Sequence, residues 1–586
     1  MKLSDYVIDF LVSQRVTHVF EVCGGALAHL LDSLYGREDI STVSMHHEMA
    51  AAIAAEGYSR VGDSIGVAMA TSGPGATNMV TGIGSCYFDS IPSLFITGQV
   101  NTYEFKFDRP VRQVGFQETD IVSIIKPITK KATLLKDADT IKYHLEEAFS
   151  LANKGRPGPI LLDIPLNIQR ADIDPKSLQS YNGAFSGLSS NLDAAVMAEI
   201  AQTIGLSTRP IILAGGGVRL SKAHWELQEF VHRTGIPVVT SLMGLDAFPH
   251  DDPMFIGMIG TYGHRYANLA IANSDLVIAL GTRLDTRQTG TRPETFARGA
   301  KLIQVDIDPN ELGNKIKVSY AINSDVKAFL TVLNNFNFDG CRERMAAWRK
   351  RIEGYKSQFP SHRMPSGELI EPTYFIHELS KFLPEDAIVC VDVGQVQMWS
   401  AQALEIRGSQ RFLTQGGMAS MGCALPMAIG ASFARPNRMV VVISGDGGFQ
   451  LNMQELQTVY HHNLPIKIIV LNNGCYGMVR QFQEQYFNSR FQSTVIGYSC
   501  PNFIDVVMAY KIPSAKITAN SEITEALSTL FSDITPGFLE VNISESSKVV
   551  PKLSVNRPVE DQEPLLSRDE LKSNMVIEIL PEPEEL

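Results

Sequence analysis

The stretches MVVVISGDGGFQ at residues 439–450 and IKIIVLNNGCYGM at 466–478 decide the fold of this chain. Each opens with a nearly continuous apolar run and ends in glycine and polar residues. Such runs are typical of parallel strands whose two faces are both covered. Because the carboxyl ends of parallel strands meet at one edge of a sheet, Asp446 and Asn473 are expected to lie side by side. One carboxylate and one amide oxygen form half of a site suited to Mg²⁺.

The same kind of apolar run recurs along the whole chain, alternating with helical patterns. Further examples are 64–71, 93–99, 159–165, 210–217, 275–281, 301–308 and 387–394. Spacers of 10–20 residues between such runs predict right-handed crossovers in a doubly wound α/β fold. Ser-, Gly- and Pro-rich stretches at 174–190 and 356–372 predict the boundaries. We expect three parallel-sheet domains at 1–175, 190–345 and 370–548, and an acidic C-terminal tail with one short helix at 549–586.

Composition excludes several classes of protein. The 586 residues include 51 basic and 63 acidic ones, a net charge of −12, with 44% hydrophobic and 19% charged residues. This balance excludes a wholly disordered chain, and no basic run suited to nucleic acid is present. No apolar run approaches the roughly 20 residues that span a bilayer. The opening MKLSDYVIDF predicts no signal peptide, so a cytoplasmic location is expected. The seven scattered cysteines predict neither disulfides nor a zinc site.

The Gly-Asp-Gly at 445–447, followed at this spacing by Asn472-Asn473, resembles the diphosphate-anchoring motif of thiamine diphosphate (ThDP) enzymes. In that family the Asp, the second Asn and a backbone carbonyl two residues later hold Mg²⁺. The resemblance therefore implies Asp446, Asn473 and the carbonyl of Cys475 as metal ligands. With VCGGA (22–26), EGYSR (56–60), TSGPGATN (71–78) and TQGGMASMGCALPMAIGA (414–431), residues 1–548 resemble the large catalytic subunit of acetolactate synthase (acetohydroxyacid synthase).

That resemblance implies roles for further residues around ThDP. Glu48 would hydrogen-bond N1′ of the aminopyrimidine ring, and Met421 would be the apolar wedge that bends the cofactor. The carbonyl of Ala419 would accept a bond from the 4′-amino group. The other implied residues are Gly394, Gln395 and Gly447 at the diphosphate, and Gly25, Phe116 and Gln117 near the reacting centre.

The middle block resembles the FAD-binding domain of the same group, in which the flavin does no net redox chemistry. The implied flavin residues are Arg156, Gly215, Gly216, Gly217, Leu242, Met243, Gly281, Arg283, Asp285, Asp306 and Asp325. Simple ThDP decarboxylases usually lack this set and carry a His-His pair after the GQ segment of the first domain. Here the pairs at 46–47 and 461–462 lie elsewhere, and both are interpreted as ordinary helix-end or surface histidines.

Departures from the usual acetolactate synthase pattern concentrate around the expected site. The usual Lys after DIP is Leu166, the usual His after GQ is Val396, and the Trp that shapes the acceptor pocket is Phe482. The Gly before the wedge segment is Ala419, and a His of the flavin loop is Tyr262. Arg287, at the position that grips the acceptor carboxylate, is retained, and Met478 completes the implied acceptor pocket. These changes make the site less cationic than usual.

The tail resembles those of acetolactate-synthase-like carboligases that use keto-sugar acceptors, as in the yersiniose-type enzymes. It is either a lid over the cofactor channel or a surface-packed or frayed terminus. We therefore expect a ThDP-, Mg²⁺- and FAD-dependent carboligase that decarboxylates pyruvate and transfers the acetyl (hydroxyethyl) unit to a ketone or keto-sugar. The resemblance implies a homodimer or homotetramer in which Glu48 and Asp446 meet across the interface; a regulatory subunit stays open.

Three alternatives to this function stay open. One is acetolactate synthase of branched-chain amino-acid biosynthesis, with a second pyruvate or 2-oxobutyrate as the acceptor. Another is a ThDP-dependent lyase or hydrolase that cleaves a C–C bond of a diketone. The third is a non-catalytic flavin-binding paralogue, which the intact Glu48, Asp446 and Asn473 disfavour.

Overall fold

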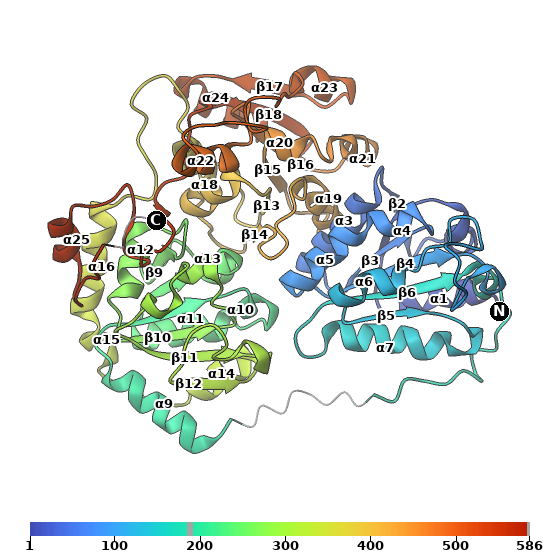
Figure 1. Cartoon of the computed structure of the whole chain (residues 1–586), viewed down its shortest axis with the longest axis horizontal. Coiled ribbons are helices and arrows are strands. Elements are labelled where there is room, and N and C mark those ends of the chain that lie inside the picture. The colour runs from blue at the N-terminus through green and yellow to red at the C-terminus, as the bar shows by residue number, and fades with distance from the viewer. Residues whose placement is uncertain (184–191, 583–586) are drawn as a thin grey trace.

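A computed structural model describes residues 1–183 and 192–582. The chain forms three six-stranded parallel sheets, each within its own α/β unit, and a tail that returns to the middle unit (Figure 1). The expected α/β class with three parallel sheets is confirmed. The expected domain start at residue 190 and the last four residues of the tail lie outside the described residues. No described helix has the length and apolar character needed to cross a bilayer.

The first sheet has the strand order β2-β1-β3-β4-β6-β5. Its strands are β1 (His18–Val22), β2 (Ser41–Ser44), β3 (Gly66–Ala70), β4 (Ser93–Gln99), β5 (Lys131–Leu134) and β6 (Pro159–Pro165). Its helices are α1 (Leu3–Ser13), α2 (Ala28–Leu34), α3 (Glu48–Val61), α4 (Pro74–Asn78), α5 (Val80–Asp89), α6 (Ile121–Ile125), α7 (Ile141–Asn153) and α8 (Leu166–Gln169). Every residue of β3, β4 and β6 is buried, which explains their continuous apolar sequences.

The second sheet has the order β12-β11-β10-β7-β8-β9. Its strands are β7 (Pro210–Ala214), β8 (Val238–Thr240), β9 (Phe255–Met258), β10 (Leu276–Leu280), β11 (Lys301–Asp306) and β12 (Tyr320–Asn323). The accompanying helices are α9 (Ala194–Leu206), α10 (Gly217–Leu220), α11 (His224–Thr234), α12 (Arg265–Ala272), α13 (Thr286–Thr289), α14 (Val326–Leu333), α15 (Cys341–Arg344) and α16 (Ala346–Gln358). The order reverses between β10 and β7, which is where ligands bind in such sheets.

The third sheet has the order β14-β13-β15-β16-β18-β17. Its strands are β13 (Ile388–Val391), β14 (Arg411–Leu413), β15 (Val440–Gly445), β16 (Ile466–Asn472), β17 (Ser514–Ile517) and β18 (Gly537–Asn542). Its helices are α17 (Pro372–Ser380), α18 (Gln395–Ala403), α19 (Ala424–Ala434), α20 (Asp446–Phe449), α21 (Leu456–His461), α22 (Gly477–Tyr486), α23 (Phe503–Ala509) and α24 (Ile523–Leu530). Strands β15 and β16 are direct neighbours, so their carboxyl ends share one edge as expected.

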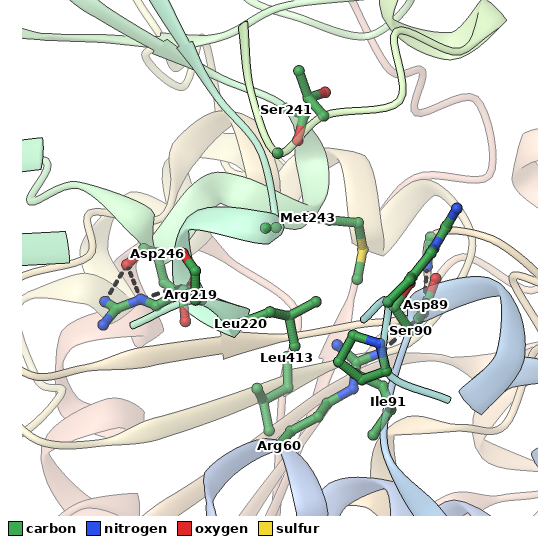
Figure 2. Close-up of a pocket in the computed structure, with 18 of the residues that line it drawn as sticks. Arg60, Asp89, Ser90, Ile91, Arg219, Leu220, Ser241, Met243, Asp246 and Leu413 are labelled. Atoms are coloured by element: carbon green, nitrogen blue, oxygen red, sulfur yellow. Dashed lines mark hydrogen bonds and ion pairs between the residues drawn. The ribbon is translucent and has the colours of Figure 1, made fainter. Parts of the chain in front are cut away.

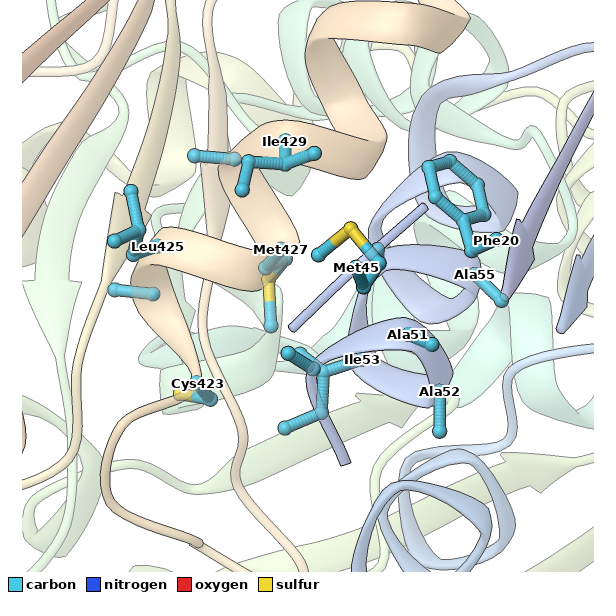
Figure 3. Packing of buried hydrophobic residues seen from close by; sticks show 14 of the residues in the cluster. Phe20, Met45, Ala51, Ala52, Ile53, Ala55, Cys423, Leu425, Met427 and Ile429 are labelled. Atoms are coloured by element: carbon cyan, nitrogen blue, oxygen red, sulfur yellow. The ribbon is translucent and has the colours of Figure 1, made fainter. Parts of the chain in front are cut away.

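Helices α3 and α19 join the first unit to the third through one continuous core (Figure 3). Two glycines allow the helices to touch. A Cβ atom added to Gly57 would lie 2.2 Å from the carbonyl oxygen of Met427, and one added to Gly430 would lie 1.8 Å from that of Ala54. The backbones therefore approach closer than any side chain would permit. This contact fixes α3, whose first residue is Glu48, against the third unit.

The described part of the tail packs on the second unit. It contains the short antiparallel pair β19 (Lys552–Leu553) and β20 (Gln562–Glu563), followed by α25 (Arg568–Asn574), which corresponds to the expected short helix. Val559 and Leu571 of the tail are buried in the core of the second unit. These contacts describe a packed terminus. A lid role stays a prediction.

Candidate active site

Three oxygen atoms converge where β15 and β16 end. The side-chain oxygen of Asn473 lies 3.1 Å from Asp446 Oδ1 and 3.0 Å from the carbonyl oxygen of Cys475. Acceptors this close repel one another unless a cation lies between them. Adjacent oxygen ligands of octahedral Mg²⁺, with bonds of about 2.1 Å, are about 3.0 Å apart. The geometry therefore fits the three expected metal ligands.

Gln395 fixes this orientation of the Asn473 amide. The Nε2 of Gln395 donates to the carbonyl oxygen of Ser547 at 2.9 Å, so its Oε1 faces Asn473 and accepts from Nδ2 of that residue at 3.0 Å. Turning the amide over would bring two acceptor oxygens together at this point. The side-chain oxygen of Asn473 is thereby directed toward Asp446 and Cys475. Among the described residues no cluster of three His, Cys, Asp or Glu side chains forms a metal site, so this centre depends on amide and carbonyl oxygens.

A cavity of about 540 Å³ extends from this centre. Gly394 and Gly445 line it with bare backbone, and no atom lies within 4 Å of the place where a Cβ atom would stand at either residue. Gly394 also has φ +142°, which favours glycine. The expected residues Gln395, Met421, Asp446, Gly447, Asn473, Cys475 and Met478 line the same cavity. This open backbone beside the three oxygen atoms fits the diphosphate half of ThDP.

The first unit gathers a second set of expected residues around the TSGPG loop. Asn78 Nδ2 donates to Glu48 Oε2 at 2.9 Å, while a Cβ atom on Gly75 would lie 3.4 Å from Glu48 Oε1. Gln117, at φ +62°, lies against Gly73 of the same loop.

Gly25 and Phe116 complete this set. Gly25 begins a short 3₁₀ turn that is held where Ala26 N donates to Thr71 Oγ1 at 3.2 Å. The side chain of Phe116 is 86% exposed. None of the described residues of this set lines the cavity of the third unit, so a single chain keeps the two halves apart.

The expected flavin residues lie at a larger cavity of about 820 Å³, which residues of all three units line. Figure 2 shows part of this lining, with Met243 labelled. Ten of the eleven line it: Arg156, Gly216, Gly217, Leu242, Met243, Gly281, Arg283, Asp285, Asp306 and Asp325. Gly215 does not. It is buried behind the cavity, where a Cβ atom would lie 2.2 Å from the carbonyl oxygen of Gly281, so its smallness allows two loops to touch.

The donors and acceptors of this cavity suit a long polar ligand such as FAD. Asp306 is buried at the end of β11, where desolvation raises its pKa to about 6, and it can accept bonds from hydroxyl groups. Arg156 of the first unit lines the same cavity and pairs with Glu311 at 2.8 Å. The residues present therefore fit the flavin that the sequence resemblance implies.

The three expected acceptor residues do not share one cavity within a chain. Met478 lines the smaller cavity and Arg287 lines the larger one. Helix α18 lies between them, since its Met398 lines the larger cavity and its Val396 the smaller. Phe482 follows Met478 by one turn of α22 and is 44% exposed. The acceptor pocket as expected from the sequence is therefore not assembled by these residues alone.

The sequence analysis did not predict two side chains that lie near the site. Tyr498 donates its hydroxyl to Asp446 Oδ2 at 2.5 Å, and Lys552 of the tail lies 5.7 Å from the ring centroid of Phe482. The stretches GYSC and VPKL that contain them carry no motif, so no local signal could have found them.

Comparison with known families agrees with this arrangement. The N-terminal TPP binding domain of thiamine pyrophosphate enzymes matches residues 1–124, their central domain matches 197–333, and their C-terminal TPP binding domain matches 392–541. These matches, with which the oxygen cluster and the cavity agree, define a ThDP-dependent enzyme.

Whole-chain relatives narrow the class. The chain is 37% identical over 579 residues to "Probable acetolactate synthase 2, chloroplastic" of Oryza sativa subsp. japonica, covering 96% of this chain and 86% of that protein. It is 37% identical over 557 residues to "Acetolactate synthase large subunit" of Porphyra purpurea, covering 94% and 93%. The chain belongs to the acetolactate synthase large-subunit family, and it is a ThDP-dependent carboligase; Mg²⁺ and FAD are typical of that family.

Proposed function

We propose that this enzyme decarboxylates pyruvate and transfers the two-carbon unit to an uncharged carbonyl acceptor, a ketone or keto-sugar. The observation that carries this proposal is the lining of the smaller cavity. Among the described residues that line it there is no Lys, Arg or His. Val396 stands where the family usually has His, and Trp399, Met421 and Met478 add apolar surface. The described residues of this lining offer the carboxylate of a second 2-oxo acid no cationic side chain, whereas a neutral ketone needs none.

The side chains have distinct tasks in this reaction. When bound, ThDP supplies the electron sink for decarboxylation. Asn78 donates to Glu48 Oε2 and leaves Oε1 near Gly75, which has no side chain, so Oε1 could hydrogen-bond N1′ of the cofactor ring. Asp446, Asn473 and the carbonyl of Cys475 would hold Mg²⁺, whose charge would offset that of the diphosphate. The apolar lining excludes water from the reacting carbon.

Formation of acetolactate is the second candidate, and the relatives support it at least as well. The observation that favours it is Arg287, which has no carboxylate partner among the described ion pairs. A free guanidinium can bind the carboxylate of a second 2-oxo acid through two parallel hydrogen bonds. Arg287 lines the larger cavity, so formation of acetolactate requires the second 2-oxo acid to approach from the side of α18 that faces this cavity.

A second copy of the chain is part of this proposal. Glu48 and Asp446 belong to two separate sets within one chain, and large apolar side chains are exposed beside both. Phe116 is 86% exposed next to the first set, while Leu451 (51%) and Val479 (52%) line the smaller cavity. We propose that a homodimer covers these side chains and brings the first set of one copy to the metal centre of the other.

Product analysis tests the choice of acceptor. The purified protein is given ThDP, Mg²⁺, FAD and pyruvate, alone and with a panel of ketones, and products are separated by chiral chromatography with mass detection. Chiral tertiary alcohols from the ketones, with little acetolactate, support the proposal. Acetolactate as the dominant product from pyruvate alone contradicts it and supports the second candidate. Release of an acid from a cyclic diketone would instead indicate a C–C hydrolase.

A further inference from the structure

A buried network of charged side chains begins on the C-terminal half of α3. Arg60 Nη2 donates to Glu56 Oε1 at 2.7 Å and to Asp89 Oδ2 at 2.8 Å. The Glu56 side chain is fully buried, and those of Asp89 and Arg60 are 1% and 8% exposed. Asp89 and Arg60 also lie together at the edge of the larger cavity (Figure 2). Nothing in the proposed chemistry uses these charges, so their burial needs another explanation.

Two carboxylates of this network, those of Asp89 and Glu56, contact one loop of the third unit, residues 415–421. Asp89 accepts the backbone N–H of Gly416 at 3.1 Å and that of Gly417 at 2.8 Å. Glu56 Oε2 accepts from Gln415 Nε2 at 2.8 Å. Gln415 Oε1 in turn accepts both the backbone N–H, at 3.2 Å, and the hydroxyl of Ser420. Two carboxylates of the first unit therefore bind the start of a loop more than 300 residues away in sequence, and the side chain of Gln415 connects that start to Ser420 near the loop's end.

The loop needs such support because its backbone is strained. Ala419 has φ +56°, a left-handed conformation that costs a residue with a Cβ atom roughly 1 kcal/mol. Strain of this kind persists only where surrounding contacts impose it. The next two residues lead to Met421, which lines the smaller cavity. Holding this backbone in place thus holds the two groups expected to contact the pyrimidine of ThDP.

We propose that Glu56, Arg60, Asp89 and Gln415 are positioning residues that hold loop 415–421 in its cofactor-binding conformation. The inference rests on the proposed roles of Ala419 and Met421 toward ThDP. It goes further by assigning to the first unit a second task, in which the C-terminal half of α3 orders the ThDP loop of its own chain. Glu48, at the other end of the same helix, is proposed to serve the site of the partner copy.

The polarity of the Glu56–Gln415 contact provides a sharp test. In Glu56→Gln the new side chain still accepts from Arg60, but its NH₂ group then faces the NH₂ group of Gln415. Turning Gln415 over relieves that clash only by losing its bond to the backbone N–H of Ser420. In Gln415→Glu two carboxylates face each other. The double variant Glu56→Gln/Gln415→Glu restores one donor opposite one acceptor at every contact and keeps the net charge unchanged.

Amide hydrogen exchange of segment 415–422 in the cofactor-free protein measures how well the loop is ordered. Quenching of the fluorescence of Trp399, which lines the smaller cavity, gives the dissociation constant of ThDP. Both are recorded at pH 8. We expect each single variant to accelerate exchange of the segment and to raise the dissociation constant about tenfold or more, and the double variant to recover both. Glu147→Gln is the matched control, since this buried Glu binds Lys131 and His144 and makes no hydrogen bond to residues 415–421.

Unchanged exchange in both single variants, or a double variant as impaired as the singles, would overturn the proposal. Faster exchange without weaker ThDP binding would also overturn it, because the loop would then not govern the cofactor. Ser420→Ala removes the hydroxyl that donates to Gln415 and lies 3.5 Å from Ser85 Oγ. This variant serves where a buried charge substitution impairs folding, and it should accelerate exchange modestly in the same segment. None of these readouts depends on the acceptor, so they stand apart from the test of the proposed function.

Discussion

Replacing Gly430 with Ala tests whether the α3–α19 contact sets the catalytic geometry. The added methyl group would lie 1.8 Å from the carbonyl oxygen of Ala54, whereas a carbon and a carbonyl oxygen approach to about 3.3 Å. The helices must then separate by roughly 1.5 Å, or one of them must bend. Overpacking of this kind costs about 1–3 kcal/mol of stability. A displacement of about 1 Å in a positioned catalytic group can cost about 100-fold in rate.

Thermal unfolding and the initial rate of pyruvate decarboxylation at saturating ThDP, Mg²⁺ and FAD measure these two effects. We expect the Gly430→Ala variant to lose several degrees in Tm and at least tenfold in kcat. The control is Gly354→Ala, because a Cβ atom at this position of α16 meets no atom within 4 Å. It should keep the rate and gain about 0.5–1 kcal/mol from helix propensity. A Gly430→Ala protein with unchanged Tm and rate would refute the reasoning from close helix contact.

Three further predictions concern single residues. Glu48→Gln should bind ThDP and FAD yet lose H/D exchange at C2 of the cofactor; exchange at the wild-type rate would refute the role assigned to Glu48. Cys475→Ser should leave the Mg²⁺ concentration for half-activation nearly unchanged, because only the backbone carbonyl of this residue is an expected ligand. Asp446→Ala should raise that concentration at least tenfold. An equal rise in both variants would contradict the expected ligand set. Burial lowers the pKa of His264 to about 4, from about 6.5 in an unfolded chain. The unfolded state therefore binds the extra proton between these values, and this residue should remove roughly 3 kcal/mol of stability as the pH falls from 6.5 to 4. Urea titrations at both pH values should show a smaller loss for His264→Gln than for the wild type, and an equal loss would count against the assignment.

The meeting of Asp446 and Asn473 at one sheet edge could be predicted from the sequence because it depends on local pattern. Continuous apolar runs mark buried parallel strands, and the residues that end two adjacent strands must lie at one edge. Asp446 and Asn473 follow from that rule alone. The orientation of the Asn473 amide does not, because Gln395 imposes it from α18. The edge strands β5 and β17 gave weaker signals, since their partial exposure interrupts the apolar pattern.

The sequence by itself determined the α/β class, the family resemblance and the residue types at the strand ends, because strand periodicity and short motifs are properties of neighbouring residues. Only the tertiary structure decided that Arg287 and Met478 line different cavities and that Gly215 packs behind the larger one. It alone brought Glu56 to Gln415, 359 positions apart in the chain. Such contacts arise from how whole sheets and helices pack, and packing leaves no periodic trace in the residues that happen to meet.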